Sequence, residues 1–340
     1  MNVRAVERDS FFDVLKFFLI AFVVFGHVIE VGEGTRFEIA LYNLIYSFHM
    51  PLFVFVSGYF SRRYDDKAER TKKLLYLVET YVVFQLFFRV PSIISGNYVS
   101  GFNRPWWILW YLFSLIIWRF VLQIIPRHLF ENDWRSVLFF SVLLSLLGGF
   151  VPIGYDFSFQ RLICFWPFFT VGYICANIRE VQFREILPNK CVAITYFIVI
   201  FIAFYIIDKS FSGVFYGSLP YSSLYGLCGR FVQLIMGCIG SLCFMGLVKG
   251  VKLPKCFMKI GVETMFFFIY HAFFVVALKT LKTHFVLEFT TIHIFLCYIL
   301  IMVLLYLLLH ISLLHKLLNP FSSLYDKKNT CRRWSQRHRS

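Results

Sequence analysis

Residues 10–30 read SFFDVLKFFLIAFVVFGHVIE, a stretch long and apolar enough to cross a bilayer as one helix. Asp13, Lys16, His27 and Glu30 interrupt this stretch. Lys16 and His27 point in nearly the same direction and lie about 16 Å apart along the helix axis, since each residue turns about 100° and rises about 1.5 Å. Asp13 and Glu30 extend the same stripe at either end. Ionisable groups inside a membrane helix usually face a protein-lined or watery cavity, so this helix is predicted to line a site.

The rest of the 340-residue chain is similar in character, with 59% hydrophobic and 21% aromatic residues. Long apolar runs recur along its length, which predicts an all-α, polytopic transmembrane helix bundle. We expect one membrane domain over residues 1–340, with a core at about 8–315 and a basic cytoplasmic tail at 316–340. Ten spans are predicted, at residues 11–30, 44–61, 74–93, 106–125, 136–152, 161–178, 191–208, 226–248, 260–278 and 289–315.

The net charge of +15 is distributed unevenly between the two sides of these spans. Of the 34 Lys and Arg residues, 24 lie in the termini and in every second loop, five in the other loops and five inside spans. The positive-inside rule therefore places both termini in the cytoplasm. The basic excess is explained by topology and by contact with membrane lipid, so no nucleic-acid partner is expected. The nine cysteines show no CxxC spacing, and no metal site is predicted.

Depth along each span gathers the polar residues at two levels. Near the outer side we expect His27, Glu30, His49, Arg161 and Arg230, together with the aromatic pair Trp110 and Tyr111 and, nearer mid-membrane, His271. Near the inner side we expect Lys16, Arg119, Lys72 and Lys73, with Arg62 and Arg63. A His of near-neutral pKa suits proton abstraction from a hydroxyl, and arginines suit a developing oxyanion.

Simpler roles stay open for several of these residues. A lone intramembrane His often bonds one helix to another, which applies to His49 and His271. Asp13 and Lys16 have the spacing of a salt bridge, and Lys72 and Lys73 suit charges that set topology. Two long outer loops, SIISGNYVSGFNRPWW (92–107) and DKSFSGVFYGSLPYSSLY (208–225), either contact a polar ligand or are simply solvated.

Five motifs together resemble the acyltransferase-3 family of integral membrane O-acyltransferases. They are RDSFFDVLKFFLIAFVVFGH (8–27), FHMPLFVFVSGYF (48–60), LWYLFSLIIWR (109–119), SFQRLICFWPFFTVGYI (158–174) and GVETMFFFIYH (261–271). The resemblance covers about residues 8–310. One departure is Lys16, where many members carry Arg, so the charge is kept but the planar fork is lost.

The resemblance implies an enzyme of the bacterial inner membrane that uses acyl-CoA, most often acetyl-CoA, as a co-substrate and binds no cofactor. The acceptor is expected to be a hydroxyl of a cell-surface carbohydrate or of its lipid-linked precursor. His27 would be the general base, with Asp13, Lys16 and Glu30 in the catalytic stripe. Lys16, Arg119, Lys72, Lys73 and Ser57 are expected on the donor side, and His49, Arg161, Arg230, Trp110, Tyr111 and His271 on the acceptor side.

Two other classes of protein share some of these features. A transporter or flippase of a polar lipid-linked glycan would use the stripe as a translocation path, but no inverted repeat or paired broken helices appear. A membrane glycan polymerase also has many spans and intramembrane arginines. The second motif, with His49 and Ser57, favours the acyltransferase. The acceptor, the acyl group, the choice between direct transfer and an acyl-enzyme, and the oligomeric state are not fixed by the sequence.

Overall fold

The computed structural model describes residues 9–61, 67–94, 101–177 and 183–320, which are helical with no strand among them. The α-helices are α1 (Ser10–Ile29), α2 (Arg36–Ser61), α3 (Lys67–Ile94), α4 (Trp110–Ile124), α5 (Arg127–Asn132), α6 (Trp134–Leu147), α7 (Phe159–Asn177), α8 (Lys190–Ile207), α9 (Ser212–Phe215), α10 (Leu224–Val248), α11 (Lys255–Val262), α12 (Thr264–Phe285), α13 (Thr291–Leu308) and α14 (Ser312–Leu318). Short 3-10 helices occur at Trp107–Leu109, Gly148–Phe150 and Asp156–Ser158.

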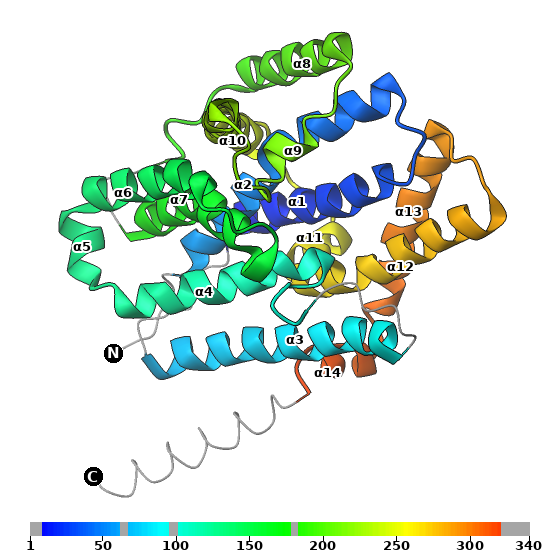
Figure 1. Cartoon of the computed structure of the whole chain (residues 1–340), viewed down its shortest axis with the longest axis horizontal. Coiled ribbons are helices and arrows are strands. Elements are labelled where there is room, and N and C mark those ends of the chain that lie inside the picture. The colour runs from blue at the N-terminus through cyan, green and yellow to red at the C-terminus, as the bar shows by residue number, and fades with distance from the viewer. Residues whose placement is uncertain (1–8, 62–66, 95–100, 178–182, 321–340) are drawn as a thin grey trace, which may run out of the picture.

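The first two helices form the centre of the bundle (Figure 1). In their most apolar 18-residue windows, 72% of residues are buried in α1 and 78% in α2. α1 starts where the side chain of Asp9 accepts a hydrogen bond of 3.1 Å from the Phe11 backbone, which caps the helix. The remaining helices surround this pair, with α8 at one edge and α3 and α14 at the opposite edge. The polar stripe of α1 is therefore enclosed by protein.

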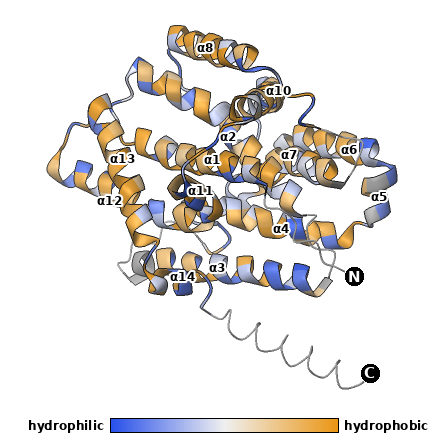
Figure 2. Ribbon diagram, turned by 180° about the vertical axis from the view of Figure 1, so that it is seen from behind, coloured by the Kyte–Doolittle hydropathy of each residue, from blue (hydrophilic) through white to orange (hydrophobic). Residues whose placement is uncertain are grey.

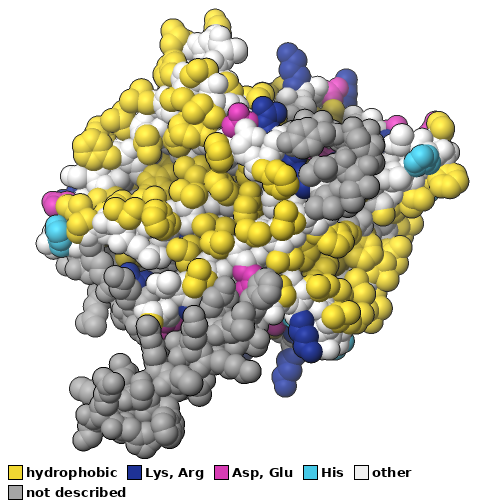
Figure 3. Space-filling model, turned by 60° about the horizontal axis from the view of Figure 1, so that its bottom comes forward, with side chains coloured by type: hydrophobic (Ala, Val, Ile, Leu, Met, Phe, Trp, Pro, Cys, Tyr) yellow, Lys and Arg dark blue, Asp and Glu magenta, His cyan; other side chains and the backbone are white. Residues whose placement is uncertain are grey.

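The outer helices present a different surface. Only 11% of the corresponding window is buried in α8 and 17% in α13. Both helices are hydrophobic around their circumference, and the molecular surface carries broad hydrophobic areas (Figures 2 and 3). A helix that is apolar all round and open to its surroundings suits contact with lipid tails. The predicted multi-pass, all-α membrane architecture is confirmed.

The number of spans stays a prediction. Eight of the described helices are long and apolar enough to cross a membrane. The other two predicted spans coincide with α3 and with the shorter apolar segment Trp134–Phe150. The cytoplasmic placement of both termini also stays a prediction, and residues 321–340 of the predicted tail lie outside the described residues.

The structure moves the boundaries of the last two predicted spans. The ninth begins at Thr264, after a break at Glu263, and continues to Phe285. The tenth ends at Leu308, where the chain turns into α14. The Thr80 hydroxyl of α3 donates to the Leu318 carbonyl at 2.9 Å, which ties α14 to α3 and keeps it out of line with α13.

Glycines in the motifs allow the central helices to approach closely. A Cβ on Gly58 of α2 would lie 2.0 Å from the Phe169 carbonyl oxygen of α7, and one on Gly172 of α7 would lie 2.0 Å from the Phe55 oxygen. Gly261 of α11 has the same relation to the Asp13 oxygen of α1, again at 2.0 Å. Any side chain at these points would separate the backbones, as in other small-residue crossings of membrane helices.

Candidate active site

A cavity of about 600 Å³ lies beside the C-terminal half of α1. It brings together four of the predicted site residues, His27 of α1, His49 of α2, Trp110 of α4 and Arg161 of α7. A cavity of this size accommodates a small-molecule ligand, and a lining rich in aromatic rings with a few polar groups is typical of such sites. These four residues, predicted for one level of the bundle, line the same cavity.

His27 lines the cavity, and one of its ring nitrogens is hydrogen-bonded within the protein. Its Nδ1 lies 3.3 Å from Glu30 Oε1 and 3.4 Å from the Tyr46 hydroxyl. A carboxylate only accepts hydrogen bonds, so in the neutral imidazole Nδ1 carries the proton and Nε2 carries the lone pair. The Trp107 ring is centred 4.7 Å from the imidazole and the His271 ring 5.5 Å from it, the latter nearly parallel at 17°. The ring is thus held in one tautomer and one orientation.

Glu30, at the end of α1, is the centre of the polar network behind His27. Its Oε1 accepts hydrogen bonds from Tyr46 at 3.2 Å and Tyr216 at 2.5 Å, and Tyr42 lies 3.4 Å away. Its Oε2 pairs with Lys279 Nζ of α12 at 3.1 Å. Groups from four parts of the chain therefore fix this carboxylate. It is suited to orienting His27 in the way that a buried carboxylate orients a catalytic imidazole.

The other two histidines of the predicted site donate to backbone carbonyls of their own helices. His49 Nδ1 lies 2.7 Å from the Ile45 oxygen, and His271 Nδ1 lies 3.0 Å from the Phe267 oxygen. A carbonyl only accepts, so in both rings Nδ1 carries the hydrogen. His49 lines the cavity, whereas His271 is fully buried behind His27 and its Nε2 has no hydrogen-bond partner among the described residues.

Arg161 and Arg230, both predicted on the acceptor side, have different surroundings. The Arg161 guanidinium lines the cavity and lies 4.9 Å from the Trp110 ring and 5.5 Å from the Tyr216 ring. Arg230 is buried against the Tyr221 ring at 5.7 Å and does not line this cavity. Both lie in the first two turns of their helices, but only Arg161 shares the cavity with His27.

The residues predicted on the donor side do not line this cavity, and each has a contact within the chain. Lys16 Nζ pairs with Asp13 Oδ1 at 3.0 Å, so the salt-bridge reading of their spacing is confirmed. Further contacts are those of Arg119 Nε with Ser61 Oγ at 3.3 Å, Ser57 Oγ with the Tyr111 hydroxyl at 2.5 Å, Lys73 Nζ with Glu69 Oε1 at 3.2 Å, and Lys72 Nζ 5.5 Å from the Tyr76 ring. Arg62 and Arg63 lie outside the described residues.

Several cavity residues were not assigned from the sequence. The two long outer loops supply them, since the first provides Arg104, Trp106 and Trp107 and the second provides Tyr216. The Gly-, Ser- and Tyr-rich composition of the second loop was the available signal for Tyr216. Arg89 of α3 also lines the cavity, and its position inside a predicted span could have marked it.

The first outer loop is tied to α3 where it enters the cavity wall. Gln85 Nε2 and Arg89 Nη2 both donate to the Arg104 carbonyl, at 2.9 and 2.5 Å, and the Trp106 backbone donates to Gln85 Oε1 at 2.8 Å. Trp107 follows with a φ of 28°, in the region that side chains rarely adopt. These contacts place the Trp107 ring against His27.

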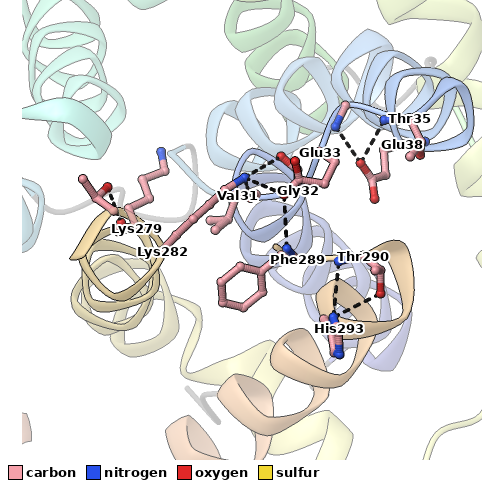
Figure 4. Close-up of polar contacts among 12 residues, drawn as sticks. Val31, Gly32, Glu33, Thr35, Glu38, Lys279, Lys282, Phe289, Thr290 and His293 are labelled. Atoms are coloured by element: carbon pink, nitrogen blue, oxygen red, sulfur yellow. Dashed lines mark hydrogen bonds and ion pairs between the residues drawn. The ribbon is translucent and has the colours of Figure 1, made fainter. Parts of the chain in front are cut away.

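A second polar network fixes the connection from α1 to α2 (Figure 4). Lys282 of α12 points toward this connection and donates to the Val31 carbonyl at 2.8 Å and to Glu33 Oε1 at 3.0 Å. The buried Glu38 accepts from the Thr35 backbone at 3.1 Å and from the Thr291 hydroxyl of α13 at 2.8 Å. α12 and α13 therefore hold the end of α1 that carries His27 and Glu30.

The chemistry available here is acid–base chemistry on a bound ligand. His27 presents an Nε2 lone pair to the cavity, with a carboxylate behind it and the cation of Arg161 in the same space. In the described part of the chain, no group of three or more His, Cys, Asp or Glu is arranged to hold a metal ion. His27 and Arg161 thus place a base and a cation in one cavity, and these are the groups that proton transfer and the binding of negative charge require.

Comparison with known proteins agrees with this class of site. Residues 9–311 match the acyltransferase domain that defines the acyltransferase-3 family, and the chain belongs to that family. It is therefore a multi-pass membrane protein of an acyltransferase family, as the sequence motifs predicted.

Two curated relatives carry the same name. The chain is 28% identical to the nodulation protein NolL of Sinorhizobium fredii over 56% of its own length and 54% of the relative. It is 45% identical to the nodulation protein NolL of Mesorhizobium japonicum over 50% of its length and 48% of that relative. The chain thus spans about half the length of the curated relatives it matches. No solved structure matches it.

Proposed function

We propose that this protein is a membrane-bound O-acyltransferase of the bacterial inner membrane. It moves an acyl group, most simply acetyl, from acyl-CoA to a hydroxyl of a cell-surface carbohydrate or of its lipid-linked precursor. The observation that carries the proposal is His27, whose Nδ1 is held by Glu30 while its Nε2 is left for a ligand in an aromatic-lined cavity. Family membership supplies the reaction class.

In the proposed step, His27 Nε2 accepts the proton of the acceptor hydroxyl as the oxygen attacks the thioester carbonyl. The new C–O bond forms, the C–S bond breaks, and the coenzyme A thiolate leaves and takes a proton from the imidazolium. Glu30 stabilises the imidazolium through Nδ1, and Tyr46, Tyr216 and Lys279 keep Glu30 in place. Arg161 and the Trp110 ring, which line the same cavity, bind the acceptor.

The donor is proposed to reach His27 from the cytoplasmic end of α1. Lys16 lies about 16 Å from His27 along the helix axis, which is roughly the length of a pantetheine arm. Lys16 and Arg119 would meet the phosphates of coenzyme A at that end, by exchanging their contacts with Asp13 and Ser61. Proposed partners are therefore an acyl-CoA, a carbohydrate acceptor and the membrane lipid.

The test is O-acyl content of surface glycans measured by mass spectrometry in cells that lack the gene, in cells complemented with the wild type, and in cells complemented with His27→Ala. Membrane vesicles from the same cells are then given acetyl-CoA with a labelled acetyl group. Label in glycan only with the wild type supports the proposal. Equal O-acyl content in all three strains, with altered glycan export instead, would overturn it in favour of transport.

A further inference from the structure

The cavity that holds His27 is strongly cationic. Arg89, Arg104 and Arg161 all line it, and in the described part of the chain no Asp or Glu does. Two carboxylates stand next to the lining, and each already has a basic partner. Asp156 accepts from Arg104 Nε at 2.5 Å, and Glu30 pairs with Lys279 at 3.1 Å.

Arg161 is the cation that this arrangement leaves without a counter-ion. Among the residues that the structure describes, no carboxylate lies within ion-pairing distance of its guanidinium and no group accepts a hydrogen bond from it; its Nε is buried and unpartnered. Its neighbours are the faces of the Trp110, Tyr155 and Tyr216 rings, at 4.9, 5.9 and 5.5 Å. Ring faces stabilise a cation but do not take up its five N–H donors.

An arginine inside a protein with its donors unused is costly unless a partner arrives. The planar fork of Arg matches a carboxylate or a phosphate through two parallel hydrogen bonds, which neither a neutral hydroxyl nor a carbonyl can reproduce. Arg161 and His27 line one cavity. A single ligand can therefore place its anionic group at Arg161 and its reacting hydroxyl at His27.

We propose that the acceptor is an acidic carbohydrate, and that Arg161 binds its carboxylate or phosphate group while His27 faces the hydroxyl to be acylated. The inference rests on the proposed function and narrows its acceptor class. A uronic acid residue would supply a carboxylate, and a glycosyl phosphate, including a lipid-linked one, would supply a phosphate. Both are anions that a cationic, aromatic-lined cavity selects over a neutral sugar.

The experiment uses purified full-length protein in detergent and follows tryptophan fluorescence, since Trp107 and Trp110 line the cavity. The probes are methyl β-D-glucuronide, glucose 1-phosphate and the neutral methyl β-D-glucoside. We expect one or both acidic probes to bind about tenfold or more tightly than the glucoside, with an affinity that falls as salt is added. The carboxylate and phosphate probes then separate the two sources of the anion.

Three variants locate the binding. Arg161→Gln should lower the affinity for the acidic probe about tenfold or more, as expected for loss of a charge-assisted pair. Arg161→Lys should lower this affinity less. Arg36→Gln removes a positive charge from an exposed arginine outside the cavity, which pairs with Asp208 at 2.7 Å, and should leave binding unchanged. Coenzyme A is titrated into the same variants, and its affinity should not depend on Arg161.

The inference fails if the glucoside binds as well as the acidic probes, if no acidic probe binds, or if Arg161→Gln binds them normally. It also fails if Arg161→Gln instead loses coenzyme A, because the cation would then serve the donor. Acyl transfer assayed on the same preparations is a separate result. A protein that acylates a neutral glycan but ignores the acidic probes keeps the proposed function and loses this inference.

Discussion

The two ends of α1 carry the same pattern of charged residues but have different surroundings. Each end has an acidic and a basic residue three positions apart, Asp13 with Lys16 and His27 with Glu30, and both pairs form, at 3.0 and 3.3 Å. At the first end, the one side-chain nitrogen of Lys16, Nζ, is bound to the Asp13 carboxylate. At the second end His27 has two nitrogens, so Nδ1 binds Glu30 and Nε2 remains for the cavity.

The two ends of α1 also differ in how tightly the surrounding helices pack against them. The Asp13–Lys16 end is packed by α11, whose Gly261 brings its backbone against α1, and by the Phe60 ring 5.5 Å from Lys16 Nζ. The His27–Glu30 end is bordered by loops and by rings that leave a cavity of about 600 Å³. Of the two pairs, only the one that contains His27 therefore borders this cavity.

The largest expected effects lie at the cavity end. His27→Ala should lower acyl transfer by about 10²–10⁴-fold, the usual contribution of a positioned general base. His49→Ala should lower acyl transfer severely but less than His27→Ala. His271→Ala removes a buried ring that stacks on His27 and should be the mildest of the three. O-acyl content of surface glycan is the measurement, with membrane levels of each variant determined in parallel.

The exposed His284 at the end of α12 offers a matched control, because His284→Ala removes an imidazole that does not line the cavity. It should behave as the wild type. A larger loss from His271→Ala than from His27→Ala would move the chemical centre away from the end of α1.

An intermediate effect is expected at the inner end. If Lys16 and Arg119 meet the phosphates of the donor, Lys16→Ala and Arg119→Ala should each raise the Kd for acetyl-CoA by about threefold to tenfold. The solubilised variants should remain monodisperse. Unchanged donor affinity in both would show that these charges only hold α1 and α4 to their neighbours, which would sharpen the contrast between the two ends.

The smallest effect is expected for Lys72 and Lys73 of α3. Lys73 already pairs with Glu69 at 3.2 Å on a partly exposed face, and exposed pairs contribute little. Lys72→Ala and Lys73→Ala should change the KM for acetyl-CoA by less than about twofold. A much larger rise in the KM for acetyl-CoA would show that both residues contact the donor and that the inner end of the bundle is a binding site.

The sequence predicts how far along its helix each residue lies, because the rise per residue is enough to calculate that position. His27, Glu30, His49, Trp110 and Arg161 meet as predicted for this reason. Rotation about each helix axis depends on packing, and the sequence does not fix it. Arg230 therefore lies at the expected end of its span but against Tyr221 and outside the cavity.

Loops were the other source of unpredicted residues. Trp107 and Tyr216 come from segments with no periodic pattern, and they reach His27 and Glu30 only through contacts with other elements. Lys279 was placed in an outer loop, but α12 continues to Phe285, so this residue is helical and reaches back to Glu30. No short-range rule in the sequence predicts these tertiary contacts.

In the proposed mechanism, chemistry occurs at the His27 end of α1 and the Lys16 end at most binds the donor. This mechanism is tested most directly by single-turnover acyl transfer, with purified protein saturated with acetyl-CoA, in His27→Ala and Lys16→Ala. We expect His27→Ala to bind the donor normally but to transfer its acyl group at least about 100-fold more slowly, and Lys16→Ala to transfer at nearly the wild-type rate once saturated. Transfer by His27→Ala at close to the wild-type rate would contradict it.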